Sequence, residues 1–243
     1  MSKGKNKFDY IISLGFSCHV AESLDSMFYR DHSYPFDWVI SDMKTINDLI
    51  ENNYFDLFNI RYLYRNSSDD NIIKHKKYSI DFYHDFSGSI ELSAQVQKVR
   101  EKYFRRIKHF NNVRKSKKRI LFIRYLKNKQ DSGDEMIEIE RFINIMKKDT
   151  TSFRMLLISN NNGGWVSQPH EYVLHHFIVK PNSEYLFDPP LSDKKIYEFF
   201  RSSIHYNRYH FLSNLLFQLR VQIPRNAVKL WKKINRTSGI YYA

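Results

Sequence analysis

The chain has 243 residues, enough for one large domain with a sizeable core, and its 17 Tyr, 19 Phe, 7 Gly and 6 Pro exclude a low-complexity or disordered protein. A single cysteine excludes an intramolecular disulfide and a multi-thiolate metal site, and it predicts a reducing compartment. The formal net charge of +13 is concentrated in residues 95–127, with 13 Lys or Arg against the single acid Glu101, and in residues 201–236, with eight basic residues and no acid.

The first predicted elements are a strand and a helix. Residues 10–14, YIISL, are apolar and partly β-branched, which predicts a short buried strand that ends at Gly15. Apolar residues at spacings of three and four then predict a helix over residues 17–29, with Ser17 as its N-cap.

A stiff loop and a second helix follow. Pro35 disfavours helix at the residue before it, so residues 33–41 are predicted to form a rigid loop. Residues 43–58 predict an amphipathic helix. Its expected inner side consists of Ile46, Leu49, Ile50 and Phe55.

The rest of the chain alternates strand and helix patterns. In order, we expect a strand over 76–86 that reaches His84 and Asp85, a basic helix over 93–113, a strand over 119–126, an acidic helix over 131–149, strands over 154–159 and 170–179, and mostly helix from residue 192. This alternation predicts an α/β layered sheet flanked by helices, with a mostly helical, basic C-terminal third. The expected domains are an α/β core over 1–190 and a helical extension over 191–243.

The position of Cys18 favours thiol chemistry. It directly follows the predicted cap, where unsatisfied backbone N–H groups and the positive end of the helix dipole stabilise a thiolate. A cysteine at a helix start paired with a histidine from a distant strand is the arrangement of a thiol hydrolase. The alternative is a small residue that fills the core.

Four segments carry a resemblance to a known family. They are ISLGFSC at 12–18, SYPFDW at 33–38, FYHDF at 82–86 and RILFIRY at 119–125. Together they resemble a bacterial and viral family of unknown function whose members are described as papain-like cysteine peptidases. The likeness covers about the first 160 residues. It implies a thiol nucleophile, which falls on Cys18, and a histidine base, which falls on His84.

A third catalytic group is less obvious. Asp85 adjoins His84, but neighbours on a strand point to opposite faces. We therefore expect Asp37, in its stiff aromatic loop, to orient the base, or else to form a cap or a buried salt bridge with an arginine such as Arg124. The predicted substrate-binding residues are Gly15, Ser17, His19, Trp38, Asp85 and Arg124. No metal or cofactor is predicted.

Three functions follow from these patterns. The first is a cysteine hydrolase or acyl-transfer enzyme acting on an amide or ester. In a variant of it, Ser17 is the nucleophile, as in small α/β esterases. The second is a peripheral-membrane transferase of surface-glycan assembly, which uses the basic segments to bind a phosphorylated or nucleotide-sugar substrate. The strand–Gly–helix opening also resembles the anion-binding first turn of nucleotide-dependent transferases. The third is a basic nucleic-acid-binding module, which the sparse aromatic residues between the cations disfavour.

Partners and location follow from the charge. The basic segments predict a phosphate-bearing or anionic substrate or partner. Residues 227–234 place Trp231 among apolar residues on one face and lysines around the other, the pattern of a helix on an anionic membrane or of a terminal helix docked on the core. The N-terminus shows no signal peptide or membrane anchor, so we expect a cytoplasmic protein, with the inner face of a membrane as the alternative. The sequence predicts no oligomeric state.

Overall fold

The computed structural model describes residues 8–26, 29–30, 32–126, 132–159, 170–177 and 199. They belong to the first of two compact units, Met1–Ile204, and the second unit is His205–Ala243. The predicted boundary at residue 190, the helical C-terminal third and the segment 227–234 lie outside the described residues, so they stay predictions.

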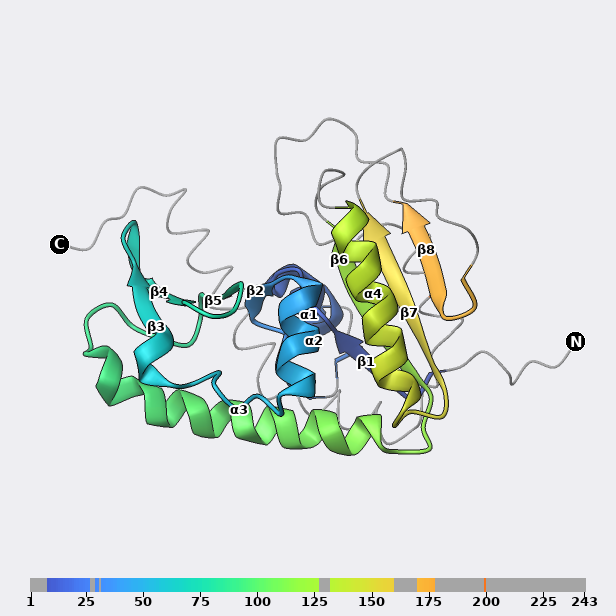
Figure 1. Cartoon of the computed structure of the whole chain (residues 1–243), viewed down its shortest axis with the longest axis horizontal. Coiled ribbons are helices and arrows are strands. Elements are labelled where there is room, and N and C mark those ends of the chain that lie inside the picture. Colours follow the sequence, from blue (N-terminus) through green and yellow to red (C-terminus); the bar gives the residue numbers. More distant parts are fainter. Residues whose placement is uncertain are drawn as a thin grey trace, which may run out of the picture. The chain divides into compact units, whose positions relative to one another are not determined.

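Two sheets and their helices form the described part (Figure 1). The parallel sheet has the order β1–β6–β7–β8, with β1 at Tyr10–Ser13, β6 at Ile120–Leu126, β7 at Phe153–Ser159 and β8 at Val173–Phe177. The antiparallel sheet has the order β2–β5–β4–β3, with β2 at Val39–Ser41, β5 at Ile80–Phe82, β4 at Asp69–His75 and β3 at Leu63–Asn66. The helices are α1 at Cys18–Ser26, α2 at Met43–Glu51, η1 at Ile60–Tyr62, α3 at Leu92–Arg114 and α4 at Ser132–Lys147. The predicted α/β class is confirmed.

Strand β6 lies inside the parallel sheet and is buried on both faces. Ile120 and Phe122 belong to the larger hydrophobic core. Leu121 and Ile123 point the other way, into a smaller core that also contains Val20 of α1. The continuous apolar run of this strand is therefore explained by helices on both faces of a parallel sheet.

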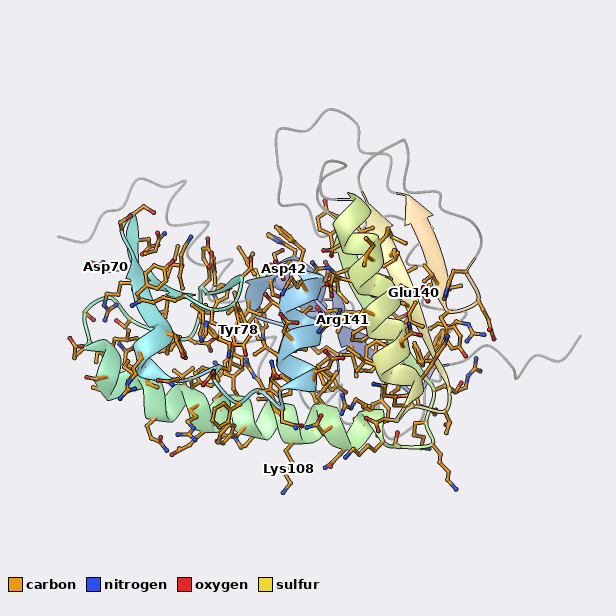
Figure 2. The ribbon with its side chains drawn as sticks, in the orientation of Figure 1. Asp42, Asp70, Tyr78, Lys108, Glu140 and Arg141 are labelled. Atoms are coloured by element: carbon orange, nitrogen blue, oxygen red, sulfur yellow. The ribbon has the colours of Figure 1, made fainter. Side chains whose placement is uncertain are left out.

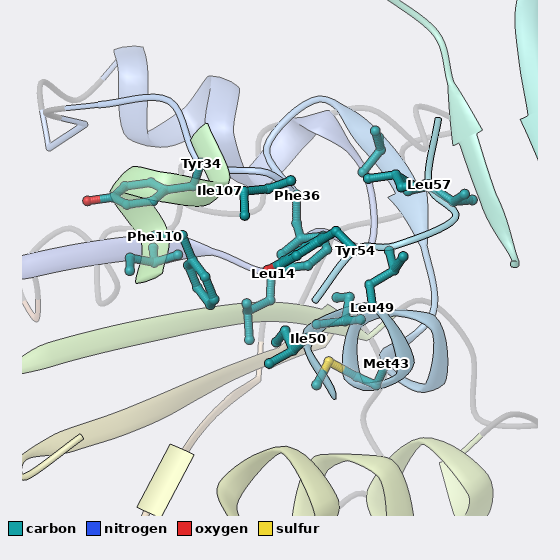
Figure 3. Close-up of a cluster of buried hydrophobic side chains, with 14 of the residues drawn as sticks. Leu14, Tyr34, Phe36, Met43, Leu49, Ile50, Tyr54, Leu57, Ile107 and Phe110 are labelled. Atoms are coloured by element: carbon teal, nitrogen blue, oxygen red, sulfur yellow. The ribbon is translucent and has the colours of Figure 1, made fainter. Parts of the chain in front are cut away.

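The larger core joins the two sheets. Its members include Phe122 of β6, Phe82 of β5 and Tyr103 of α3. Figure 3 shows one part of this core, where Phe36 and Phe110 meet, and their rings are edge to face at 6.1 Å. Both sheets and α3 thus share one apolar interior, which fixes the segments between them.

Helix α2 ends earlier than its sequence pattern predicts. Its C-cap is Asn52, and Asn53 and Tyr54 have positive φ angles of 51° and 59°. Asparagine adopts this left-handed conformation more readily than most residues. Because the chain turns here, Tyr54 is buried and Phe55 is 86% exposed, so the prediction that Phe55 lies on the inner side is wrong.

The antiparallel sheet contains the other differences. The strand expected over 76–86 is only Ile80–Phe82 and ends before His84, while β3 and β4 form a hairpin that the sequence pattern did not predict. Strand β2 occupies the end of the predicted loop over 33–41. These strands of three to seven residues pair with one another.

Ion pairs join α2 to α4. Arg141 of α4 donates to Asp48 at 2.9 Å and Glu51 at 2.5 Å, and it lies beside α2 in Figure 2. Asn47 of α2 also donates to the Glu138 carbonyl at 2.7 Å. Among the described helices, none is long and apolar enough to cross a lipid bilayer.

Candidate active site

A pocket of about 410 Å³ lies beside the first turn of α1. The described residues that line it come from five places: the turn after β1, the first turn of α1, the start of β2 with the residue before it, the residues after β5 and the end of β6. They are Phe16, Ser17, Cys18, His19, Trp38, Val39, Ile40, Tyr83, His84 and Tyr125. The volume lies within the range of about 300–1,000 Å³ that is usual for small-molecule sites.

The turn between β1 and α1 is fixed by backbone contacts. Gly15 has a φ of +76°, a conformation that a side chain would strain. Its carbonyl accepts a hydrogen bond from Tyr125 N at 3.1 Å, and the Phe16 carbonyl accepts one from Ser41 N at 3.1 Å. The start of α1 is therefore held to β6 and β2 at once. Gly15 shapes the turn but does not line the pocket.

Cys18 is the first residue of α1 and is partly buried. Burial raises the pKa of its thiol, and the Glu22 carboxylate, one turn later in α1, raises it further. Burial and the Glu22 carboxylate thus oppose the thiolate that the helix start is expected to stabilise, while a backbone hydrogen bond at Cys18 lowers the pKa of the thiol. The nucleophile would have to lose its proton to a base during attack.

His84 follows β5 and is exposed at the pocket. The ring of Trp38 meets it edge to face, with the ring centres 5.7 Å apart. Within the described residues, no hydrogen bond joins the Cys18 sulfur to this ring. The two groups nevertheless share one pocket, as a nucleophile and its base require.

A second histidine of the pocket, His19, lies at the same helix start and contacts Ser17. The Ser17 hydroxyl is 2.5 Å from His19 Nδ1, and both residues line the pocket. Ser17 is buried, whereas His19 is partly exposed. This hydrogen bond fixes the side chain of His19 next to the first turn of α1.

Asp37 lies behind the pocket rather than in it. Its buried carboxylate accepts hydrogen bonds from Arg30 at 2.9 Å and from Tyr34 N at 2.8 Å. Burial raises the pKa of this carboxyl, and the nearby Arg30 charge opposes that rise. The same guanidinium stacks on Trp38 at 5.1 Å. No described contact joins Asp37 to His84, and the buried salt bridge considered for Asp37 is with Arg30, not Arg124.

Arg124 is also turned away from the pocket. It donates to Glu135 of α4 at 2.7 Å, to the Leu14 carbonyl at 2.8 Å and to the Ser41 carbonyl at 2.9 Å. Because side chains alternate along a strand, its neighbour Tyr125 faces the opposite side and lines the pocket. Arg124 therefore ties together the elements that carry the site.

Asp85 points into the interior. Its side chain is fully buried, where it accepts hydrogen bonds from Lys102 and, at 2.7 Å, from Tyr103. Burial and this carboxylate hold the pKa of the Tyr103 hydroxyl well above its ordinary value. As expected for adjacent residues, Asp85 and His84 point in different directions.

Five of the nine candidate residues thus meet at the pocket: Ser17, Cys18, His19, Trp38 and His84. The other four, Gly15, Asp37, Asp85 and Arg124, do not line it. Sequence reasoning missed Phe16, Val39, Ile40, Tyr83 and Tyr125. Their sequence positions could have indicated them, since each lies next to a predicted site residue or one residue further on. Across the described ranges, no three His, Cys, Asp or Glu side chains are grouped so as to hold a metal ion.

The comparisons with known proteins cover this site. A family model described as "Putative papain-like cysteine peptidase (DUF1796)" matches residues 9–163. The chain belongs to this family. "Uncharacterized protein R408" of Acanthamoeba polyphaga mimivirus is 30% identical to it over 182 residues, which are 64% of this chain and 81% of the viral protein. No solved structure matches the chain. Every residue that lines the pocket lies within the family match.

Proposed function

We propose that this protein is a cysteine hydrolase or acyl-transfer enzyme that acts on an amide or ester, with Cys18 as nucleophile and His84 as general base. One observation carries the proposal: the single cysteine, at a helix start, and an exposed histidine from a distant strand end line the same pocket. Membership of the papain-like family supports it. The single cysteine, without a disulfide framework, fits a reducing compartment, so a cytoplasmic location is part of the proposal.

The first half of the reaction transfers an acyl group to the enzyme. The Cys18 sulfur attacks the carbonyl carbon while its proton moves to His84, and a tetrahedral oxyanion forms. The bond to the leaving group then breaks, and His84 returns the proton to the departing amine or alcohol. Water or another acceptor attacks the thioester in the second half, gives its proton to His84, and releases Cys18 as a thiol.

Because the pKa of the Cys18 thiol is raised, His84 has to remove the thiol proton during attack. A thiol that is mostly protonated at neutral pH reacts slowly unless a base takes the proton in the transition state. The backbone N–H groups in the first turn of α1 have no acceptor within the helix, so they are suited to bind the oxyanion. The helix start thus contributes to stabilisation of the transition state rather than of a resting thiolate.

The test is formation of an acyl-enzyme. The protein is mixed with p-nitrophenyl acetate, nitrophenol release is followed, and intact mass shows whether an acetyl group stays on Cys18. We expect acetylation to disappear in Cys18→Ala and to slow by about 100-fold or more in His84→Gln, the range for loss of a general base. An unchanged acetylation rate in His84→Gln would reject His84 as the base.

His19→Gln is the matched control, because it removes the other imidazole of the pocket. The proposal expects a much smaller effect there, since the Nδ1 atom of His19 is occupied by Ser17. A loss equal to that of His84→Gln would transfer the role of base to His19.

The contact between Ser17 and His19 favours a second candidate, a serine hydrolase. An oxygen nucleophile and its base would lie 2.5 Å apart, within hydrogen-bond reach. In that case the acetyl group would be found on Ser17, Ser17→Ala would abolish it, and Cys18→Ala would leave it unchanged. Peptide mapping of the acetylated protein distinguishes the two residues.

A further inference from the structure

We infer that the pocket binds an apolar, uncharged group on the acyl side of the substrate, so that the enzyme selects aliphatic or aromatic acyl donors over charged ones. The assignment of this group to the acyl side rests on the proposed function, whereas the preference of the pocket for an apolar group does not. The inference specifies which class of acyl donor binds in the pocket beside Cys18.

The walls of the pocket carry the argument. Six of its described lining residues are aromatic or aliphatic: Phe16, Trp38, Val39, Ile40, Tyr83 and Tyr125. Its other described lining residues are Ser17, Cys18, His19 and His84, none of them a carboxylate, lysine or arginine. An apolar wall gains free energy when it covers an apolar group, and it penalises a charge that loses its water.

The two described arginines that stack on wall residues, Arg30 on Trp38 and Arg124 on Phe16, are already paired with carboxylates. Arg30, which stacks on Trp38, pairs with Asp37 at 2.9 Å. Arg124, the strand neighbour of Tyr125, pairs with Glu135 at 2.7 Å. Neither cation is available to a carboxylate in the substrate. The strongly basic character of the whole chain therefore does not extend to this pocket.

The polar groups are gathered at the reacting end. Cys18 and the pair of Ser17 and His19 lie at the helix start, and His84 adds one imidazole. A few polar groups beside apolar walls are typical of sites that orient a small molecule. The carbonyl of the substrate fits the polar end, and its side group fits the aromatic walls.

Tyr83 provides a way to test the wall. It lines the pocket and is 41% exposed, so its removal leaves the buried core unchanged. Tyr64 of β3 is a matched control, because it is also a tyrosine with 41% exposure but does not line the pocket.

The experiment measures binding first, without chemistry. Four N-methyl amides that differ only in the acyl group, N-methyl-3-phenylpropanamide, N-methylheptanamide, N-methylsuccinamic acid and 3-amino-N-methylpropanamide, are titrated into the full chain and followed by ligand-observed NMR. We expect the phenyl or hexyl compound to bind about tenfold or more tightly than the two charged ones. Tyr83→Ala should reduce that preference by about threefold, and Tyr64→Ala should not change it. Preference for phenyl indicates an aromatic residue as the natural acyl group, and preference for hexyl indicates a fatty acyl chain.

The same four side groups on chloromethyl ketones, where each is attached directly to the carbonyl, then test reactivity at Cys18, whose sulfur displaces chloride. The labelling rates, measured by intact mass, should follow the order of binding. Equal or tighter binding of a charged compound overturns the inference, whatever Cys18 does. If apolar binding is preferred but Cys18 forms no acyl-enzyme, the proposed function fails and the assignment of the pocket stands.

Discussion

Cys18 lies at a helix start, a position that favours a reactive thiolate. Its thiol is also partly buried and near the Glu22 carboxylate of the same helix, and both effects favour the protonated thiol. Reactive cysteines usually sit in electropositive surroundings that lower the thiol pKa. Here the electropositive helix start competes with burial and with Glu22. A thiol of this kind is protected from indiscriminate oxidation and alkylation, and it becomes nucleophilic only beside a base.

Replacing Glu22 should make the thiol more acidic. In Glu22→Gln, loss of the negative charge stabilises the thiolate, so the pKa of Cys18 falls and alkylation by iodoacetamide becomes faster at neutral pH. In the natural protein the alkylation rate should still be increasing at about pH 9, above the ordinary cysteine pKa of about 8.5. The pH profile of labelling, followed by mass, checks both statements. Glu101→Gln on α3 is the control and should leave the profile unchanged.

The pair of Asp37 and Arg30 should be important for stability. Asp37→Asn leaves the largely buried guanidinium of Arg30 with only the Asp25 carboxylate at 3.6 Å, and breaking a buried pair costs about 3–5 kcal/mol. Urea unfolding measures the loss. Asp81→Asn removes a more exposed carboxylate whose lysine lies 3.6 Å away, and it should cost less than about 1 kcal/mol. Equal losses in the two variants would contradict a structural role for Asp37.

The site residues show what a sequence can and cannot reveal. Cys18 was identified from its type and its place at a predicted helix start, whereas His84 was implied by the resemblance to the family, and both line the pocket. Arg124 was expected there, but the alternation of the strand places Tyr125 at the pocket instead. Asp37 was expected to orient the base, but the sequence does not show that its carboxylate pairs with Arg30. Charge partners are set by tertiary contacts, which one sequence does not contain.

Among the elements, those with strong internal patterns were predicted correctly. Helix α3 extends over 23 residues with a repeating buried face, and β6 is an unbroken apolar run. The hairpin of β3 and β4 was missed because its strands are polar and partly exposed, so neither alternation nor hydrophobicity distinguishes them from a loop. Short strands of this kind are stabilised by pairing, and pairing is not local information.

Strand β6 holds the site through Arg124, which binds β1, β2 and α4 together. Arg124→Gln should lower the free energy of unfolding by about 3 kcal/mol, because Glu135 and two carbonyls lose a buried donor. Arg154→Gln on neighbouring β7 should lower it by less than about 1 kcal/mol, since Arg154 has no carboxylate partner among the described residues. Chemical denaturation compares the two. A small loss in Arg124→Gln would show that packing alone joins these elements.

At the scale of the molecule, one concentration of positive charge in the described part of the chain lies along α3. Lys98, Arg105 and Lys108 are exposed on this helix, without an ion pair among the described residues, and Lys108 projects outward in Figure 2. The predicted phosphate-bearing or anionic partner remains a prediction. This row of cations, rather than the pocket, is where we expect it to bind.

Removing three of these charges tests that location. The triple variant Lys98→Gln, Arg105→Gln, Lys108→Gln should elute from a heparin column at clearly lower salt than the natural chain, because each lost cation weakens the contact with sulfates. The control triple, Lys44→Gln, Lys74→Gln, Lys77→Gln, loses the same net charge from lysines that already pair with carboxylates. If both triples elute at the same salt, total charge rather than α3 determines binding.

The pairing of β1 with β6 has a consequence for how the protein folds. Tyr10 lies opposite Ile120, so the strand that leads into Cys18 pairs with a residue 110 positions later in the chain. Such distant contacts slow folding, because the entropy of closing a long loop is lost before any contact repays it. During synthesis on the ribosome, the pocket can assemble only after β6 has emerged. Until then Cys18 is an accessible thiol on an incompletely folded chain. The burial that raises its pKa is present only after β1 has paired with β6.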